Sequence, residues 1–208
     1  MEFLLNEKGN RSAMLSLPSF WPLIKGTNDV KLIEITSDIL IKNGYSNWSF
    51  RWLMERYLLH PTNEKIIYLL TEASSEILDY ELMRFCGELG LATGRSNLRS
   101  VERLLDSLLA LGDEKRCLEV LDRIEDSRKT IKMIQLELRI MFYGNQNPQQ
   151  VIDYFLKIDK QKRTSEILTH AALAYSQLDD LFSATNLLQP LIEKNDPNAA
   201  MAMYELLR

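Results

Sequence analysis

The chain has 208 residues, of which 46% are hydrophobic and 26% are charged, and its formal net charge is −4 at pH 7. This small negative charge argues against a nonspecific nucleic-acid binder, and no uninterrupted apolar run approaches the ~20 residues that a membrane-spanning helix needs. With only 8 Gly and 6 Pro, the composition favours helices over turn-rich sheet. We therefore expect a helical protein with no nucleic-acid partner and no membrane insertion.

The N-terminus and the cysteines bear on the cellular compartment. The chain starts MEFLLNEK, so an acidic residue is at position 2 and no basic stretch precedes an apolar segment. A secretory signal peptide is therefore not expected. Cys86 and Cys117 have neither a metal-binding nor a redox spacing. Together these features predict a cytoplasmic protein.

The first clear helical pattern starts after residues 1–28. Asn28 and Asp29 can cap a helix through VKLIEITSDILIKNG, which ends at a turn marked by Gly44. Residues 1–28 do not share this pattern, although they contain three apolar residues around two prolines: Phe20, Trp21 and Leu23.

The next stretch, YSNWSFRWLMERY, holds five aromatic residues that cannot all point the same way on one helix. Aromatic residues at helical spacing are more often core than surface, but Trp is also a favoured interface anchor. Two interpretations of Trp48, Phe50 and Trp52 therefore stay open: packing against residues 1–28, or an interface.

Three further helix pairs follow. EKIIYLLTEASS and SEILDYELMRFCGEL form the second pair, and LATGRSN, residues 91–97, is the clearest internal break, either a longer turn or a hinge. Apolar residues at helical spacing from Val101 to Leu108, then DEKRCLEVLDRI, predict the third pair. A polar turn before Pro148 divides the two helices of the fourth pair.

The stretch from Leu168 to Pro197 has the most specific pattern. Two antiparallel helices that cross closely need small side chains at the crossing and larger ones beside it. Ala171, Ala172 and Ala184 are the small residues here, and the larger ones are Leu168, Tyr175, Leu188 and Leu191. This order of large, small, aromatic, small and bulky residues followed by proline resembles a tetratricopeptide repeat (TPR).

The same register recurs along the chain. Stepping back from Ala184 by about 34 residues, the repeat length of that family, reaches Val151, Cys117, Leu82 and Ser49, with steps of 33, 34, 35 and 33. The resemblance implies an all-α fold, a right-handed superhelical solenoid of antiparallel helix hairpins, with five hairpins over residues 29–195.

Such arrays need covers at their ends, because a terminal hairpin would otherwise expose its stacking face. We therefore expect residues 1–28 to form an N-terminal cap or extension and residues 196–208 to form a C-terminal solvating helix. A site for a partner or for self-association is the alternative for residues 1–28.

The sequence shows no catalytic or metal-binding constellation. His60 and His170 are far apart and lack a neighbouring nucleophile or a second zinc ligand. Gly87, Gly90 and Gly94 lack the lysine and serine of a phosphate-binding loop. We therefore predict a protein that is not an enzyme and needs no cofactor.

In TPR arrays the first helices of the hairpins line a concave groove, so the resemblance implies a protein or peptide partner. The register places ten residues on or near this wall: Glu34, Asp38, Ile67, Thr71, Glu102, Asp106, Leu136, Thr169, His170 and Leu173. Family members that clamp a terminal carboxylate carry Lys, Asn and Arg there, whereas four of these positions are acidic. Charge complementarity then favours a basic or amphipathic segment.

Two classes of function stay open. The first is an adaptor or secretion-type chaperone that holds a segment of a partner protein in the groove. The alternative is a structural subunit of a larger assembly, or a homodimer, that acts through the aromatic N-terminal region. Light scattering with and without Trp48→Ala and Trp52→Ala distinguishes them, because loss of a dimer favours the assembly subunit.

Overall fold

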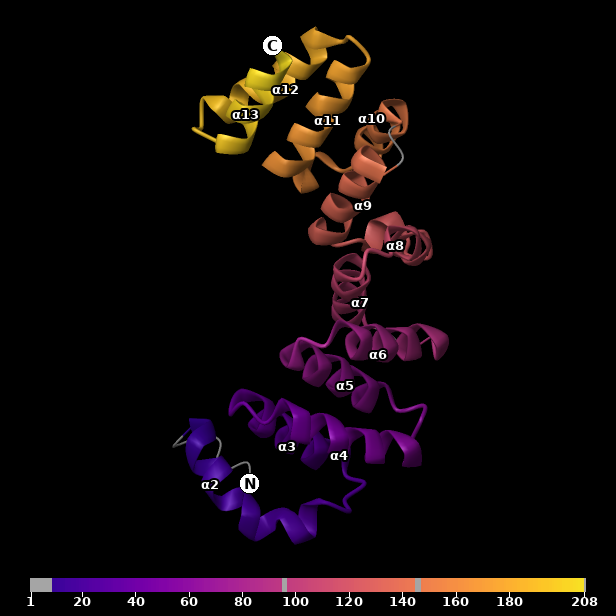
Figure 1. Cartoon of the computed structure of the whole chain (residues 1–208), viewed down its shortest axis with the longest axis vertical. Helices are drawn as coiled ribbons and strands as arrows, with labels where there is room; N and C mark the ends of the chain where they lie inside the picture. The colour runs from indigo at the N-terminus through magenta and orange to yellow at the C-terminus, as the bar shows by residue number, and fades with distance from the viewer. Residues whose placement is uncertain (1–8, 95–96, 145–146, 208) are drawn as a thin grey trace. The chain divides into compact units, whose positions relative to one another are not determined.

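The computed structural model describes residues 9–94, 97–144 and 147–207, and over these ranges it contains helices and no strand (Figure 1). The predicted all-α class is confirmed. The α-helices are α2 (Gly9–Ile24), α3 (Val30–Lys42), α4 (Ser46–Leu59), α5 (Glu64–Ile77), α6 (Tyr80–Ala92), α7 (Leu98–Ala110), α8 (Glu114–Leu121), α9 (Ile131–Gly144), α10 (Pro148–Lys157), α11 (Ser165–Gln177), α12 (Leu181–Ile192) and α13 (Pro197–Leu206). Two short 3-10 helices are η1 (Asp126–Arg128) and η2 (Lys160–Lys162). None of the described helices is both long enough and apolar enough to cross a membrane.

The chain divides into two compact units, Met1–Asp113 and Glu114–Arg208, called here the N-terminal and C-terminal units. The division lies in the turn between α7 and α8. It does not lie at residues 91–97, where the sequence pattern indicated the clearest break. The two helices of the predicted third hairpin therefore belong to different units.

In the N-terminal unit, α3 pairs with α4 and α5 pairs with α6, and α7 packs against α6 (Figure 1). The turn after α3 requires Gly44, whose φ of +82° is a conformation that favours glycine. Thr36 and Ser37, the small pair of α3, are fully buried, with Ile33 and Leu40 buried beside them. The small residues therefore lie inside the helix packing, as the repeat pattern predicts.

The aromatic stretch of α4 packs against α2. The ring of Trp21 lies 4.6 Å from that of Trp48 and 5.3 Å from that of Trp52, measured between centroids. Trp52 is 3% exposed, and its Nε1 donates a hydrogen bond of 3.0 Å to the carbonyl oxygen of Lys25. Trp48 and Phe50 are partly buried against the same core. Trp48 and Trp52 therefore pack against residues 1–28, and Phe50 packs against the core of the N-terminal unit.

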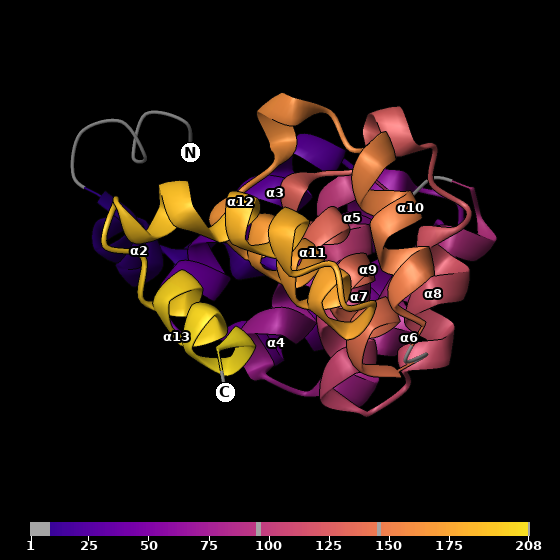
Figure 2. The ribbon, with the colours of Figure 1, turned by 90° about the horizontal axis from the view of Figure 1, so that it is seen from above.

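In the C-terminal unit, α9 pairs with α10, α11 pairs with α12, and α13 packs against both α11 and α12. Helices α11 and α12 lie side by side in both views (Figures 1 and 2). Ala171, Ala172 and Ala184 are fully buried, so the predicted close crossing is present here. Ala199 and Ala202 bring α13 into the same core.

The equivalent positions of the second helices recur more regularly in the structure than the predicted steps of 33, 34, 35 and 33 residues. Ser49, Cys117, Val151 and Ala184 are each the fourth residue of their helix, and all four are fully buried. In α6 the fourth residue is Met83, which is 4% exposed, whereas Leu82 is only partly buried. The assignment of Leu82 was therefore wrong by one residue. Asp79 caps α6 by accepting a hydrogen bond from the backbone of Leu82, which sets this start.

Candidate protein-interaction surfaces

The first helices of the N-terminal unit share a polar face, called here the N-terminal wall. Two rows of partly exposed residues recur on α3, α5 and α7 at intervals of 34: Glu34, Tyr68 and Glu102, and Asp38, Glu72 and Asp106. Four of these six were predicted wall residues. The two that sequence reasoning missed, Tyr68 and Glu72, are each one residue after a predicted position.

Ile67 and Thr71, the predicted wall residues of α5, are 2% and 0% exposed. The hydroxyl of Thr71 donates a hydrogen bond of 3.0 Å to the carbonyl oxygen of Ile67, so its polar atom is satisfied inside the helix. These two residues face the core and do not contribute to the binding surface. A strict 34-residue step from Glu34 and Asp38 is the signal that would have found Tyr68 and Glu72.

Three acidic residues of the N-terminal wall, Glu34, Asp38 and Glu72, are paired with bases. Glu34 forms an ion pair of 2.6 Å with Lys65, which joins α3 to α5. Glu72 lies 3.0 Å from Arg99 and 3.7 Å from Arg103, which joins α5 to α7. Asp38 pairs with Lys42 at 2.5 Å, and Glu102 and Asp106 also interact with other groups. Charges of both signs therefore lie on the wall at these three residues, and each exposed pair contributes little to stability.

The C-terminal unit has a pocket of about 330 Å³ among α9, α11 and α13, called here the α11 pocket. Three predicted groove residues line it: Thr169, His170 and Leu173. Leu136, the fourth predicted residue in this unit, is 6% exposed and lies in the core. The other lining residues are Arg139, Tyr143, Glu166, Asn198, Met201, Ala202 and Glu205.

The imidazole of His170 is held in one orientation at this pocket. Its Nδ1 lies 2.9 Å from the carbonyl oxygen of Glu166. Because a carbonyl oxygen can only accept, Nδ1 carries the proton and Nε2 of the neutral ring has the free lone pair. The rings of Phe142 and Tyr143 stand edge-on to the imidazole, at 5.9 and 6.0 Å between centroids. In the neutral ring Nε2 of His170 is therefore a hydrogen-bond acceptor, and the residue is 8% exposed.

The hydroxyl of Thr169 is the second polar group of the α11 pocket held in place by burial. Thr169 is 8% exposed, and its Oγ1 has no hydrogen-bond partner among the described residues. Thr71 shows the usual alternative, a hydrogen bond back to the preceding helical turn. The hydroxyls of Thr36, Ser37 and Ser49 in the N-terminal unit are likewise buried without a partner among the described residues.

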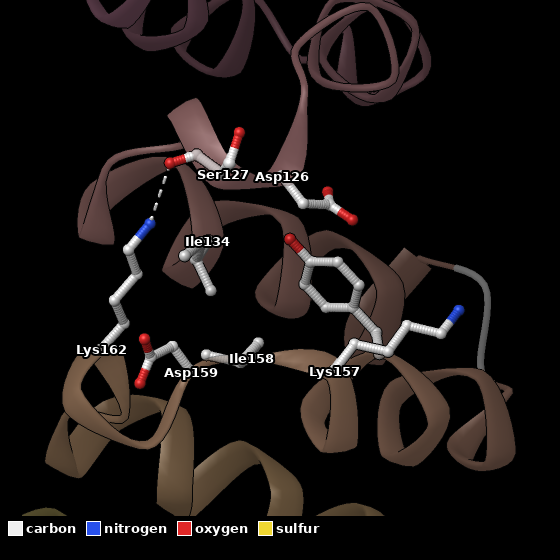
Figure 3. A pocket seen from close by; sticks show the side chains of 8 residues that line it. Asp126, Ser127, Ile134, Lys157, Ile158, Asp159 and Lys162 are labelled. Carbon is white, nitrogen blue, oxygen red and sulfur yellow. Dashed lines mark hydrogen bonds between the residues drawn. The ribbon is translucent and has the colours of Figure 1, made fainter.

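A second cavity of about 330 Å³ in the C-terminal unit adjoins η1 and η2 (Figure 3). Lys162 links the two segments, since its Nζ donates to the carbonyl oxygens of Lys129 at 3.0 Å and Ser127 at 3.5 Å. The remaining lining residues are Asp126, Ile134, Tyr154, Lys157, Ile158 and Asp159.

A buried charge network lies beside this second cavity. Lys129, 4% exposed, donates to both carboxylate oxygens of Glu137, at 2.8 and 3.0 Å, and pairs with Asp126 at 2.9 Å. The phenol of Tyr154 donates to Glu137 as well. Burial alone would lower the pKa of Lys129, but its hydrogen bonds and charge attraction to Glu137 and Asp126 outweigh burial, so its pKa is raised. Burial and the bond to Glu137 also raise the pKa of Tyr154.

Sequence reasoning missed this network, although a signal was present. Residues 124–130 read IEDSRKT and residues 158–164 read IDKQKRT, so an isoleucine, an acid, a base and a threonine recur at the 34-residue interval. The two stretches contain η1 and η2. The repeat therefore extends into the connections between hairpins.

No group of three or more His, Cys, Asp or Glu that could hold a metal ion occurs in the part of the chain that the structure describes. Cys86 and Cys117 are both buried, and burial raises the pKa of the Cys86 thiol to about 12, against the smaller opposing effect of a hydrogen bond with Ser74. His60 lies in the N-terminal unit, where its Nε2 is 3.2 Å from Oδ1 of Asn28.

Comparison with solved structures shows the fold. The chain is similar to the TPR protein YrrB, described as having an unusual peptide-binding site, with a TM-score of 0.69, 14% identity, and coverage of 89% of this chain and 97% of YrrB. It is also similar to a structure described as the MamA RS-1 ArsTM double mutant, with a TM-score of 0.65, 17% identity, and coverage of 80% of this chain and 94% of that one. No protein-family model matches the sequence, and no curated protein does either. The fold is TPR-like, as the sequence resemblance predicted.

Proposed function

Starting from this TPR-like fold, we propose that the protein is a non-enzymatic interaction scaffold that holds a segment of a partner protein, with the α11 pocket as its main binding site. The observation that carries the proposal is the pocket itself, which opens at Thr169, His170 and Leu173 on a first helix of the repeat. Tyr143 and Met201 on its walls are 62% and 65% exposed. Exposed aromatic and sulfur side chains around a pocket are typical of protein-binding surfaces.

The partner segment in this proposal is amphipathic. The α11 pocket combines the apolar Leu173 and Met201 with the charged Arg139, Glu166 and Glu205. The N-terminal wall adds charges of both signs, which suit a segment that also carries both. The peptide-binding site in the description of YrrB supports a peptide as the class of ligand. An adaptor or a secretion-type chaperone in the cytoplasm is the cellular role we propose.

In the same proposal the ends of the chain are covers rather than binding sites. Leu17 and Ile24 of α2 are 2% and 3% exposed and lie in the core of the N-terminal unit. Ala199 and Ala202 of α13 are buried in the C-terminal unit. We therefore assign residues 1–28 as a cap, 29–195 as five hairpins and 196–208 as a solvating helix.

The alternative function is a homodimer or assembly subunit that acts through the aromatic N-terminal region. The predicted interface side chains of this region expose little surface to a partner. Trp52 is buried, and Trp48 and Phe50 are partly covered by packing inside the N-terminal unit. Tyr45, at 48% exposure, is the aromatic residue of this stretch most open to a partner. Light scattering of Tyr45→Ala tests this alternative without disturbing the tryptophans.

The proposal is tested with a phage-displayed library of random 12-residue peptides selected on the full chain, and with titration calorimetry on the enriched peptides. We expect Tyr143→Ala and Met201→Glu to weaken binding by about tenfold or more, as hot-spot residues do. Phe182→Ala is the matched control, because Phe182 is 78% exposed on α12 and does not line the pocket. Enrichment on the wild-type chain is compared with enrichment on the Tyr143→Ala, Met201→Glu double variant. If no peptide is enriched more on the wild-type chain, the proposal is refuted.

A further inference from the structure

The α11 pocket is lined by two carboxylates and one cationic side chain. Glu166 and Glu205 contribute carboxylates, and neither forms an ion pair with any residue in the described ranges. Nε2 of His170 adds a lone pair, because its Nδ1 is already used by the carbonyl oxygen of Glu166. Arg139 is the one cationic side chain among the lining residues. The pocket therefore suits a ligand group that donates hydrogen bonds and carries positive charge.

One of these polar groups, the imidazole of His170, is built into the pocket wall. His170 is 8% exposed, whereas Oγ1 of Thr169 beside it is covered by protein atoms. A purely apolar ligand group would leave Nε2 of His170 unpaired in a drier environment, which costs binding energy. An acidic group would face the carboxylates of Glu166 and Glu205.

We propose that the α11 pocket takes an arginine side chain of the partner segment, an inference that rests on the proposed function of this same site. The guanidinium has five donors in a planar fork and no acceptor, which matches the acceptor groups of the pocket. Its plane can stack on the exposed ring of Tyr143. The aliphatic part of the side chain then lies along Leu173 and Met201.

Arg139 gives the proposal its sharpest test. It is an exposed lining residue on α9 with the same charge as the proposed ligand, so it repels a guanidinium and attracts an acid. Its removal and the removal of the carboxylates must therefore change arginine affinity in opposite directions. A structural role for these exposed side chains would not produce opposite signs.

The probe is the capped tripeptide acetyl-Leu-Arg-Leu-amide, titrated into the full chain while the histidine Hε1 resonances are followed by NMR. The chain has two histidines. His170 lines the pocket, and His60, in the N-terminal unit next to Asn28, is the internal control. We expect a saturable shift for His170 and none for His60. The same peptide with citrulline, a neutral isostere of arginine, should bind about tenfold more weakly.

The variants extend the test. Glu166→Gln with Glu205→Gln should weaken the arginine peptide about tenfold, and Arg139→Gln should strengthen it severalfold. If the citrulline peptide bound as tightly as the arginine peptide, the arginine assignment would be overturned. It would also be overturned if acetyl-Leu-Glu-Leu-amide bound more tightly than the arginine peptide and Arg139→Gln abolished that binding.

The two proposals fail in different ways. If the library peptides shift His170 but the arginine tripeptide does not, the arginine assignment falls and peptide binding stands. If neither kind of peptide shifts His170, the pocket is not the peptide site, and both proposals are refuted.

Discussion

The two units bury different kinds of side chain. The N-terminal unit encloses tryptophans, with Trp21 and Trp52 in contact, and its Glu34–Lys65 ion pair lies on the surface. In the C-terminal unit both partners of an ion pair are buried, since Lys129 and Glu137 are 4% and 2% exposed. The repeat constrains only the residues where helices cross, and the remaining positions are free to differ between units.

This difference has an energetic consequence. An exposed ion pair is worth about 0–1 kcal/mol, because water solvates both charges well when they are apart. A buried pair is sensitive to the loss of one partner, because the other charge is then left without solvent or a counter-ion. The same kind of substitution should therefore have a large effect in the C-terminal unit and a small one on the N-terminal wall.

The largest expected effect is that of Lys129→Met, which leaves the buried carboxylate of Glu137 without its cation. We expect a loss of about 3–5 kcal/mol in the free energy of unfolding of the C-terminal unit. Lys65→Met, on the N-terminal wall, removes the partner of Glu34 and should cost about 1 kcal/mol or less. Urea unfolding followed by far-UV circular dichroism measures both.

Tryptophan fluorescence adds a separate observation, because Trp21, Trp48 and Trp52 all lie in the N-terminal unit. The control for a general effect of losing a lysine is Lys160→Met, since Lys160 is exposed in η2. If Lys129→Met unfolded at the same urea concentration as Lys160→Met, the contrast between the two units would be lost.

The next effect tests how closely helices approach in the N-terminal unit. A Cβ added at Gly87 of α6 would lie 2.6 Å from Cβ of Leu104 on α7, so the two helices would have to separate. Overpacking costs about 1–3 kcal/mol, which exceeds the gain of up to about 1 kcal/mol from replacing a helical glycine by alanine. Gly87→Ala should therefore destabilise the N-terminal unit by about 1–2 kcal/mol, measured by tryptophan fluorescence in urea.

Gly26→Ala is the matched control, because a Cβ there meets no atom within 4 Å. Its stability should stay within about 0.5 kcal/mol of the wild-type value. The C-terminal unit achieves its close crossing with Ala171, Ala172 and Ala184 instead of glycine. An unchanged midpoint for Gly87→Ala would mean that the N-terminal unit tolerates alanine at its crossing as well.

The helices could be predicted from sequence because their signals are local. Small residues at the crossings, caps such as Asp29 and Asn97, and the 34-residue interval all lie within one hairpin or its neighbour. The errors at Leu82, Ile67 and Thr71 are each of one residue. One residue is 100° around a helix, which is enough to exchange a surface position for a core position.

The candidate site could be predicted only in part. Thr169, His170 and Leu173 follow from the register of α11, but the other walls of the pocket come from α9 and α13. For the buried network the recurring residues 124–130 and 158–164 are a signal of the connections, but they do not show that Glu137 is buried. A charged residue such as Glu137 is expected on a helix surface, and its burial depends on Lys129 reaching it from the connection that contains η1.

The smallest expected effect concerns the helix caps. Both units use Asp at some helices and Asn at others, and Asp29 and Asp79 cap α3 and α6 of the N-terminal unit. In the N-terminal unit α5 and α7 are capped by Asn63 and Asn97, which do not ionise. In the C-terminal unit α12 and α13 are capped by Asp180 and Asp196. Hydrogen bonds from Ser183 lower the pKa of Asp180, and those from Ser165 and the backbone of α13 lower that of Asp196 below its ordinary value of 3.8.

A carboxylate whose pKa is lowered by folding contributes stability that is complete above its unfolded pKa and is lost as the pH falls through its folded pKa. Below pH 3.8 we therefore expect the first turns of α12 and α13 to fray before those of α5 and α7. The ¹³Cα chemical shifts of Ser183 and Ala199, compared with those of Ile66 and Ser100, measure this. Asp196→Asn should keep the cap of α13 and remove its pH dependence, whereas equal fraying of all four helices would show that ionisation of the caps does not set this difference.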